Sequence, residues 1–209
     1  MHIDFLVEEP SAERVLQAVL PKILEGKATH LIRVFQGKKD LLTKLPVRLK
    51  GYKRRIKNNE DLRIVVLVDQ DHEDCRALKN RLERMAEESG FITKTKAHYG
   101  EIVYVVNRIV VEEIEAWLFG DIPALRQIYP RLSPTMDRHR KYRDPDAIQG
   151  GTWEALHREI QRAGYNMPIF PKIEVASRVA KYMDPRNNRS RSFNLFKGSI
   201  EWLIGSTPI

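Results

Sequence analysis

The chain has 209 residues, enough for one hydrophobic core or for one domain with an appendage. No apolar stretch approaches the ~18–20 residues that cross a bilayer, and the N-terminus lacks a charged segment followed by a long apolar one, so the sequence predicts neither a membrane anchor nor a signal peptide. The single cysteine, Cys75, excludes an internal disulfide and favours the reducing cytoplasm, while a formal net charge of +8 at pH 7 favours a polyanionic partner.

The first half of the chain alternates apolar strands with amphipathic helices. Strands are predicted at residues 3–7, 30–35 and 63–68. Helices are predicted after them: one opened by Pro10 and capped by Ser11, one from Lys38 to about Arg48, and one over residues 76–88. Pro46 is expected to kink or split the second helix. Because strands separated by helices pair in parallel through right-handed crossovers, the pattern predicts an α/β fold.

A fourth apolar run, at residues 102–111, predicts a mostly parallel four-stranded sheet flanked by helices. Beyond Asp121 the composition changes, and proline, arginine and tyrosine become frequent. Further helices are predicted at about 153–163, 172–183 and 193–203. We therefore expect a core over residues 1–121 and a helical, basic C-terminal extension over 122–209 that packs on it.

Acidic residues directly follow two of the apolar strands. Asp69 and Asp71 follow residues 65–68, and Glu8 follows residues 3–7. Side chains alternate along a strand, so Asp69 and Asp71 are expected on the same face, roughly 6–7 Å apart. Because the carboxyl ends of parallel strands lie together, Glu8 is expected to join them. The alternative is a solvated strand-to-helix turn in which aspartate caps the helix.

The acidic cluster predicts a bound cation. Glu113 and Glu115 follow the fourth apolar run and are expected to approach the same edge of the sheet. Gathering so many acids costs Coulomb repulsion, which cations or intervening water relieve. We expect one or two Mg²⁺ or Mn²⁺ ions between the acids and a phosphate, held by Asp69 and Asp71. Glu8 either completes the ligand set or acts as a general base.

Basic residues gather in three segments, at residues 48–57, 138–143 and 186–191. Each segment alone reads as a solvated face, but beside an acidic site the three together predict a surface for a phosphate backbone. The candidate nucleic-acid contacts are Lys38, Arg54, Arg55, Arg189, Ser190 and Arg191. Lys172, which precedes an amphipathic helix, is a candidate to neutralise charge that develops on the phosphate; the alternative is an exposed lysine at a helix start.

Several motifs carry a resemblance to a known family. They are Val7-Glu8-Glu9-Pro10-Ser11, Phe35-Gln36-Gly37-Lys38, Val68-Asp69-Gln70-Asp71, Glu113-Ile114-Glu115-Ala116-Trp117, Tyr142-Arg143-Asp144-Pro145-Asp146 and Asn188-Arg189-Ser190-Arg191-Ser192-Phe193. A strand ending in Glu8, followed after two strand–helix units by Asp69-x-Asp71, resembles the Toprim fold of topoisomerases, primases and OLD-type nucleases. Over nearly its whole length the chain resembles a family of small stand-alone Toprim-like bacterial proteins of unknown function, often encoded beside ABC-type or AAA ATPases in phage-defence cassettes.

The resemblance implies Mg²⁺-dependent phosphodiester cleavage of DNA or RNA, together with an ATPase partner. It implies metal binding by Glu8, Asp69 and Asp71, with Glu113 and Glu115 as candidates for a second ion. Toprim proteins usually have glycine after the glutamate, where this chain has Glu9. This departure favours the alternative of a non-catalytic Toprim-like subunit that binds an ATPase or nucleic acid. A phosphatase acting on small substrates would use the same acids, and a homo-oligomer remains open.

Overall fold

Four parallel strands form the centre of the structure, a computed structural model that describes residues 1–98 and 100–205. They are β1 (His2–Val7), β2 (Thr29–Val34), β3 (Leu62–Asp69) and β4 (Val105–Val110). Their spatial order is β2-β1-β3-β4, and every neighbouring pair is parallel. The predicted α/β fold with its parallel sheet is confirmed.

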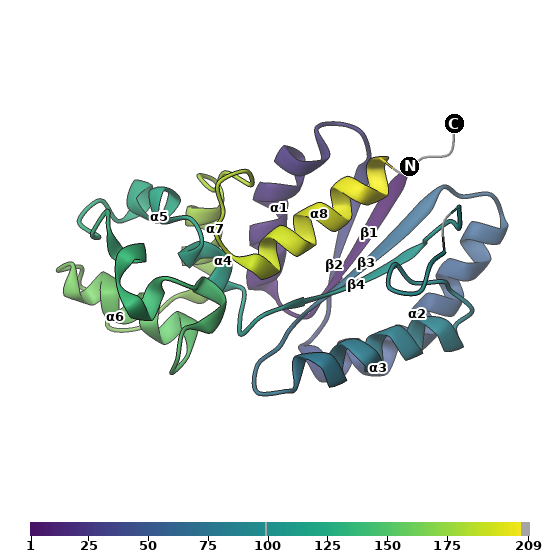
Figure 1. The fold of residues 1–209 in the computed structure, drawn as a ribbon, viewed down its shortest axis with the longest axis horizontal. Coiled ribbons are helices and arrows are strands. Elements are labelled where there is room, and N and C mark those ends of the chain that lie inside the picture. Colours follow the sequence, from purple (N-terminus) through teal and green to yellow (C-terminus); the bar gives the residue numbers. More distant parts are fainter. Residues whose placement is uncertain (99, 206–209) are drawn as a thin grey trace.

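Helices cover both faces of the sheet (Figure 1). The first face carries α1 (Pro10–Leu24) and α8 (Arg191–Gly205), and the second carries α2 (Lys38–Lys57) and α3 (Cys75–Glu88). Successive strand residues point to opposite faces, so Phe5 and Val65 join the core beneath α1, whereas Leu6 and Val66 join the core beneath α2. Burial on both faces explains the continuous apolar run at residues 64–68 of β3, whereas the edge strand β2 is more polar and has no buried position.

The remaining helices lie beyond the carboxyl ends of the strands (Figure 1). They are α4 (Glu115–Phe119), α5 (Ile122–Ile128), α6 (Thr152–Arg162) and α7 (Lys172–Ala180), with short 3₁₀ turns at η1 (Met136–Arg138), η2 (Arg140–Tyr142) and η3 (Pro145–Ala147). Helix α7 packs on α1, and α8 packs on β4. In the part of the chain that the structure describes, no helix is long and apolar enough to span a membrane.

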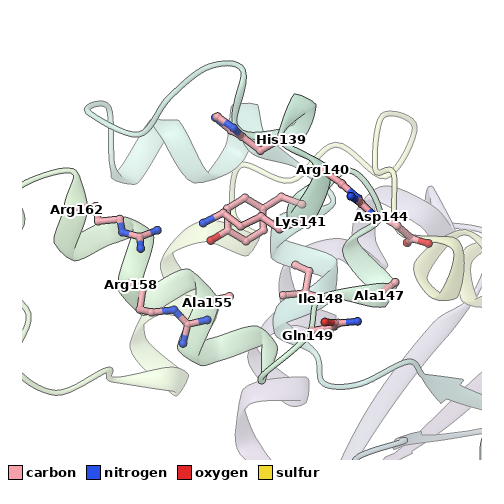
Figure 2. Close-up of a pocket in the computed structure, with 11 residues that line it drawn as sticks. His139, Arg140, Lys141, Asp144, Ala147, Ile148, Gln149, Ala155, Arg158 and Arg162 are labelled. Atoms are coloured by element: carbon pink, nitrogen blue, oxygen red, sulfur yellow. The ribbon is translucent and has the colours of Figure 1, made fainter.

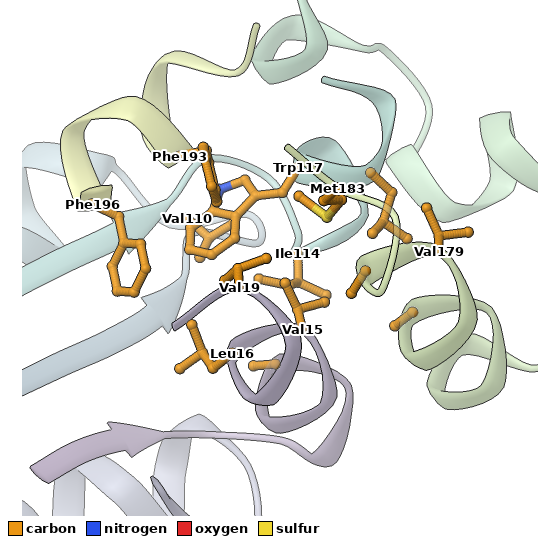
Figure 3. Close-up of a cluster of buried hydrophobic side chains, with 14 of the residues drawn as sticks. Val15, Leu16, Val19, Val110, Ile114, Trp117, Val179, Met183, Phe193 and Phe196 are labelled. Atoms are coloured by element: carbon orange, nitrogen blue, oxygen red, sulfur yellow. The ribbon is translucent and has the colours of Figure 1, made fainter. Parts of the chain in front are cut away.

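Aromatic side chains join the last helix to the sheet. The ring of Trp117 lies 5.1 Å from that of Phe193 and 5.0 Å from that of Phe196, and Phe196 also lies 6.2 Å from Phe5 of β1 (Figure 3). Residues on both sides of position 121 therefore share one hydrophobic cluster. The domain boundary at that position stays a prediction.

Several predicted boundaries were wrong. Pro46 does not divide the second helix, which continues to Lys57. Leu45 and Leu49 are fully buried on either side of this residue, and their packing offsets the cost of the missing N–H, about 3 kcal/mol. Strand β4 is shorter than the apolar run that predicted it, and α8 begins at Arg191 instead of residue 193.

Candidate functional site

Two buried acids meet where neighbouring strands end. Glu8 directly follows β1, Asp69 is the last residue of β3, and the two residues are 6% and 5% exposed. The Oε1 atom of Glu8 accepts a hydrogen bond of 2.6 Å from the backbone N–H of Asp69. Parallel pairing of β1 with β3 brings them together, as the sequence predicts.

Asp71 lies in the turn after β3, and its side chain is half exposed. Its φ of +50° shows that the strand has ended, so the alternation expected between Asp69 and Asp71 does not extend to it. The ammonium of Lys38, the first residue of α2, lies 2.6 Å from the Asp71 carboxylate and 3.2 Å from that of Glu73. Lys38, predicted to contact nucleic acid, therefore belongs to the acidic edge of the sheet.

Glu115 is the first residue of α4 and is only 1% exposed. Neither of its carboxylate oxygens has a hydrogen-bond partner among residues 1–98 and 100–205. Glu113, just before this helix, lies 3.0 Å from the ammonium of Lys172 and accepts a 3.4 Å hydrogen bond from the backbone N–H of Trp153. Helices α4, α6 and α7 thus begin beside one another, and Lys172 joins the acids.

The charges of the acids shift one another's pKa values. Burial raises the pKa of Glu8 to about 7, although the Asp69 N–H and the charge of Lys38 act to lower it. Burial and the charge of Glu113 raise the pKa of Glu115 to about 7, against the opposing charge of Lys172. Burial, followed by the charges of Glu8, Glu9 and Glu115, raises the pKa of Asp69 well above its ordinary value. These mutual effects show that the carboxylates form one electrostatic unit.

This unit suits a hard divalent cation. Its donors are carboxylate oxygens, and those of Glu115 are buried without a partner in the described part of the chain. Buried carboxylates that lack partners are costly, and a cation would relieve that cost. Within the described residues, however, no three His, Cys, Asp or Glu side chains stand in a ready-made ligand group. The donor chemistry therefore fits a cation, and binding one requires the side chains to rearrange.

Two of the predicted nucleic-acid contacts lie far from the acids. Arg54 and Arg55 are in the last turn of α2, whereas Lys38 opens the same helix. At 1.5 Å per residue, about 25 Å of helix separates them from Lys38. Arg55 forms an ion pair of 2.7 Å with Glu60. The structure does not bring this pair of arginines to the acidic edge.

The predicted contacts near the start of α8 have structural partners. Ser190 is fully buried, and its hydroxyl donates a 2.7 Å hydrogen bond to Asp146 and accepts one of 3.1 Å from the backbone N–H of Phe193. Arg189 forms a 3.3 Å ion pair with Asp137, and Arg191 is exposed. Ser190 therefore caps α8, and phosphate contacts by these three residues stay a prediction.

Two acids of the cluster were not among the predicted ligands. Glu9 contributes to the raised pKa values of Glu8 and Asp69, and Glu73 pairs with Lys38. Both lie within two residues of a predicted ligand in the sequence. Their position beside predicted ligands was the sequence feature that could have identified them as part of the site.

Comparison with solved structures finds similarity to the C-terminal region of the Burkholderia pseudomallei OLD protein, at 15% identity and a TM-score of 0.47, over 98% of this chain and 97% of that one. The chain is also similar to the C-terminal region of the Xanthomonas campestris pv. campestris OLD protein, at 16% identity and a TM-score of 0.47, over 97% and 95% of the two chains. No curated protein sequence matches significantly. Residues 7–201 match the family described as a domain of unknown function, DUF4276, and the chain belongs to that family.

Proposed function

We propose that the protein is a metal-dependent phosphodiester hydrolase that acts on nucleic acid. The observation that carries this proposal is the burial of three carboxylates, Glu8, Asp69 and Glu115, near the carboxyl edge of one parallel sheet, where the charges of Glu8 and Glu115 raise the pKa of Asp69. Open α/β sheets bind their ligands at this edge. The positive net charge of the chain supports a polyanionic substrate.

The cation would be Mg²⁺ or Mn²⁺. Glu8, Asp69 and Asp71 would hold a first ion, and Glu113 and Glu115 a second. When bound, a divalent cation supplies Lewis-acid polarisation of a phosphodiester oxygen. The raised pKa values of the buried acids support this role, because a cation compensates the repulsion that otherwise favours protonation.

The chain's own residues supply the proton chemistry and further charge. Where Asp69 and Asp71 hold the ion and Glu8 does not complete the ligand set, Glu8, with a pKa of about 7, can accept a proton from an attacking water near neutral pH. Lys172 stands 3.0 Å from Glu113 and 5.2 Å from the centre of the Trp153 ring. From this position its ammonium can stabilise negative charge that builds up on the phosphate.

The family resemblance seen in the sequence extends the proposal to the cellular setting. It supports a cytoplasmic effector that works with an ABC-type or AAA ATPase in defence against phage. A constitutively active nuclease would damage its host, so control by such a partner is a natural part of the proposal. The substrate can be DNA or RNA.

The first experiment measures cation binding and cleavage in the same preparations. Titration calorimetry with Mn²⁺ should show binding to the wild type that is lost in Asp69→Asn, whereas Glu201→Gln, an exposed acid on α8, should bind normally. Plasmid, linear DNA and tRNA should be cleaved only with the divalent cation, in the presence of the partner ATPase where it is required. Cleavage that persists in Asp69→Asn would reject the proposal.

A second candidate is a non-catalytic binding subunit. Lys38 and Lys172 already pair with Asp71 and Glu113, and these ion pairs neutralise two of the acids without any metal ion. In that case Mn²⁺ titration should give little heat, and nucleic acid should be bound without being cut. The same calorimetric experiment therefore separates the two functions.

A further inference from the structure

A second concave site lies in the helical part of the molecule. It is a pocket of about 620 Å³ between α6 and the loop segment 139–149 (Figure 2). Figure 2 shows Arg158 and Arg162 on α6, facing Lys141, Ile148 and Gln149 of that segment. The volume falls in the ordinary range for small-ligand sites, about 300–1,000 Å³.

The lining of this pocket is strongly basic. Arg140, Lys141, Arg158 and Arg162 line it, with Asp144 as the acid among the lining residues. Arg140 and Arg158 form no ion pair with any residue in the described part of the chain. Two guanidinium groups are therefore available to a ligand, and guanidinium binds phosphate through paired hydrogen bonds.

Glu159 holds the other two cations in place. Its Oε1 atom lies 3.0 Å from the ammonium of Lys141 and 2.6 Å from a guanidinium nitrogen of Arg162, and it also accepts a 2.7 Å hydrogen bond from the Tyr142 hydroxyl. One carboxylate thus orients two cations, and the three groups together keep a net positive charge. Cations fixed in this way lose less side-chain entropy when an anion binds.

The loop wall of the pocket is anchored at two points. Asp146 accepts a 2.7 Å hydrogen bond from the Ser190 hydroxyl and another from the backbone N–H of Ser192. The ring of Tyr142 stacks on Phe119 of α4, with 5.1 Å between ring centres, and α4 begins with Glu115. The pocket and the acidic edge are therefore built on the same packed helices.

The pocket also has an apolar side. Tyr142, Ile148 and Ala155 line it together with the cations. These side chains are only 3%, 3% and 1% exposed, and the Tyr142 ring lies between Phe119 and the ammonium of Lys141, so they form the floor beneath the cations. A ligand therefore meets the exposed charged side chains of the lining, which suit the phosphate of a nucleotide.

We infer that this pocket binds one nucleotide of the nucleic-acid strand, away from the bond that is cut. The inference rests on the proposed function and adds an anchoring site to it. Helix α6 links the two places, since the N–H of Trp153 bonds Glu113 and Arg158 follows five residues later. That interval is about 7.5 Å along the helix axis.

Binding is measured without catalysis, by fluorescence anisotropy of a fluorescein-labelled single-stranded 12-mer in EDTA. Arg140→Ala/Arg158→Ala should weaken binding by at least about tenfold and reduce the salt slope of log K by about 0.7, the value for one phosphate contact on a single strand. The matched control is Arg81→Ala/Arg84→Ala, which removes two exposed arginines from α3. Its affinity should stay within about twofold of the wild type.

Three results with the oligonucleotide would overturn the inference, and a fourth comes from a competitor. They are equal weakening in both double variants, no weakening in the pocket variant, and no binding of the oligonucleotide by the wild type. Adenosine monophosphate is tested as a competitor, and if it binds as tightly as the 12-mer the pocket belongs to a free nucleotide and the inference fails. EDTA prevents metal-dependent cleavage, so this assay measures binding separately from catalysis. If the pocket binds the oligonucleotide but the protein never cleaves nucleic acid, the proposed hydrolase function is rejected and the inference about the pocket stands.

Discussion

The carboxylate of Glu8 accepts a 2.6 Å hydrogen bond from the main-chain N–H of Asp69, so the acid that follows β1 satisfies the backbone where β3 ends. Both residues are buried. Glu8→Ala leaves this N–H without its acceptor and should lower the free energy of unfolding by about 1–3 kcal/mol. Glu8→Gln keeps an acceptor oxygen and removes a buried charge, so at pH 8 it should cost less. Urea unfolding checks both variants, and equal losses would contradict the role of the hydrogen bond.

Glu115 should make stability depend on pH. Its pKa is about 7 in the folded protein and 4.5 ordinarily, so between these values the folded state holds the proton more tightly. The free energy of unfolding should therefore fall as pH rises through this window and level off above it. Glu115→Gln removes this contribution and should exceed the wild type in stability at pH 8 by up to about 3 kcal/mol, at about 1.4 kcal/mol per pH unit.

Thermal unfolding from pH 4 to pH 8 provides the measurement. The two proteins should differ least at the acid end of the series, where Glu115 is protonated in either state. If the wild type is more stable than Glu115→Gln at pH 8, the charge of the Glu115 carboxylate is compensated in some other way.

Divalent cations should stabilise the protein, and more strongly at pH 8 than at pH 5. Protons and cations compete for the same carboxylates, and a ligand that binds only the folded state raises Tm. Tm is measured in about 5 mM MgCl₂ and in EDTA at each pH, at constant ionic strength. Asp69→Asn is the control and should lose most of the difference. An equal gain at both pH values would point to a general salt effect.

Two glycines should respond to alanine in opposite directions. A Cβ at Gly120 would collide with Oδ1 of Asn188, whose amide donates a 2.8 Å hydrogen bond to the carbonyl of Trp117. Gly120→Ala should therefore destabilise the protein by about 1–3 kcal/mol. A Cβ at Gly198 in α8 would meet no described atom within 4 Å, so Gly198→Ala should stabilise by about 0.5–1 kcal/mol. Urea unfolding of the two variants checks the opposite signs.

Ser190→Ala should destabilise α8. The hydroxyl bonds the N–H of Phe193 and the carboxylate of Asp146, and loss of a helix cap costs about 0.5–2 kcal/mol. Arg191→Ala, which changes an exposed neighbour, should leave the urea midpoint nearly unchanged. If oligonucleotide affinity falls in Ser190→Ala while stability does not, the serine acts on phosphate directly, as the sequence predicts.

Strands β1 and β3 were predictable because almost every position in them is buried, whereas β2, at the edge of the sheet, has no buried position. The structure extends β3 by one residue at each end of the predicted range, and the parallel pairing that follows from the pattern brings Glu8 to Asp69. Helix α2 was predicted too short, because the local cost of Pro46 was visible in the sequence and the burial of Leu49 was not.

Contacts of the helices beyond the sheet escaped prediction. Glu115 was a candidate ligand, but its complete burial depends on how α4 packs against α6 and α7. The basic pocket joins residues 139–149 to α6, and no local pattern pairs them. Arg158 and Arg162 are four residues apart on one helix, and this spacing was the sequence feature that indicated one basic side of the pocket.

The contact between Phe5 and Phe196 joins the first strand to a helix formed 191 positions later in the chain. During synthesis on the ribosome, Phe5 and Trp117 therefore lack their contact with Phe196 until α8 has left the exit tunnel. The nascent protein is consequently exposed to aggregation and to chaperones for most of its translation. Any activity that depends on the packed helices at the acidic edge begins only after the chain has been released as far as α8.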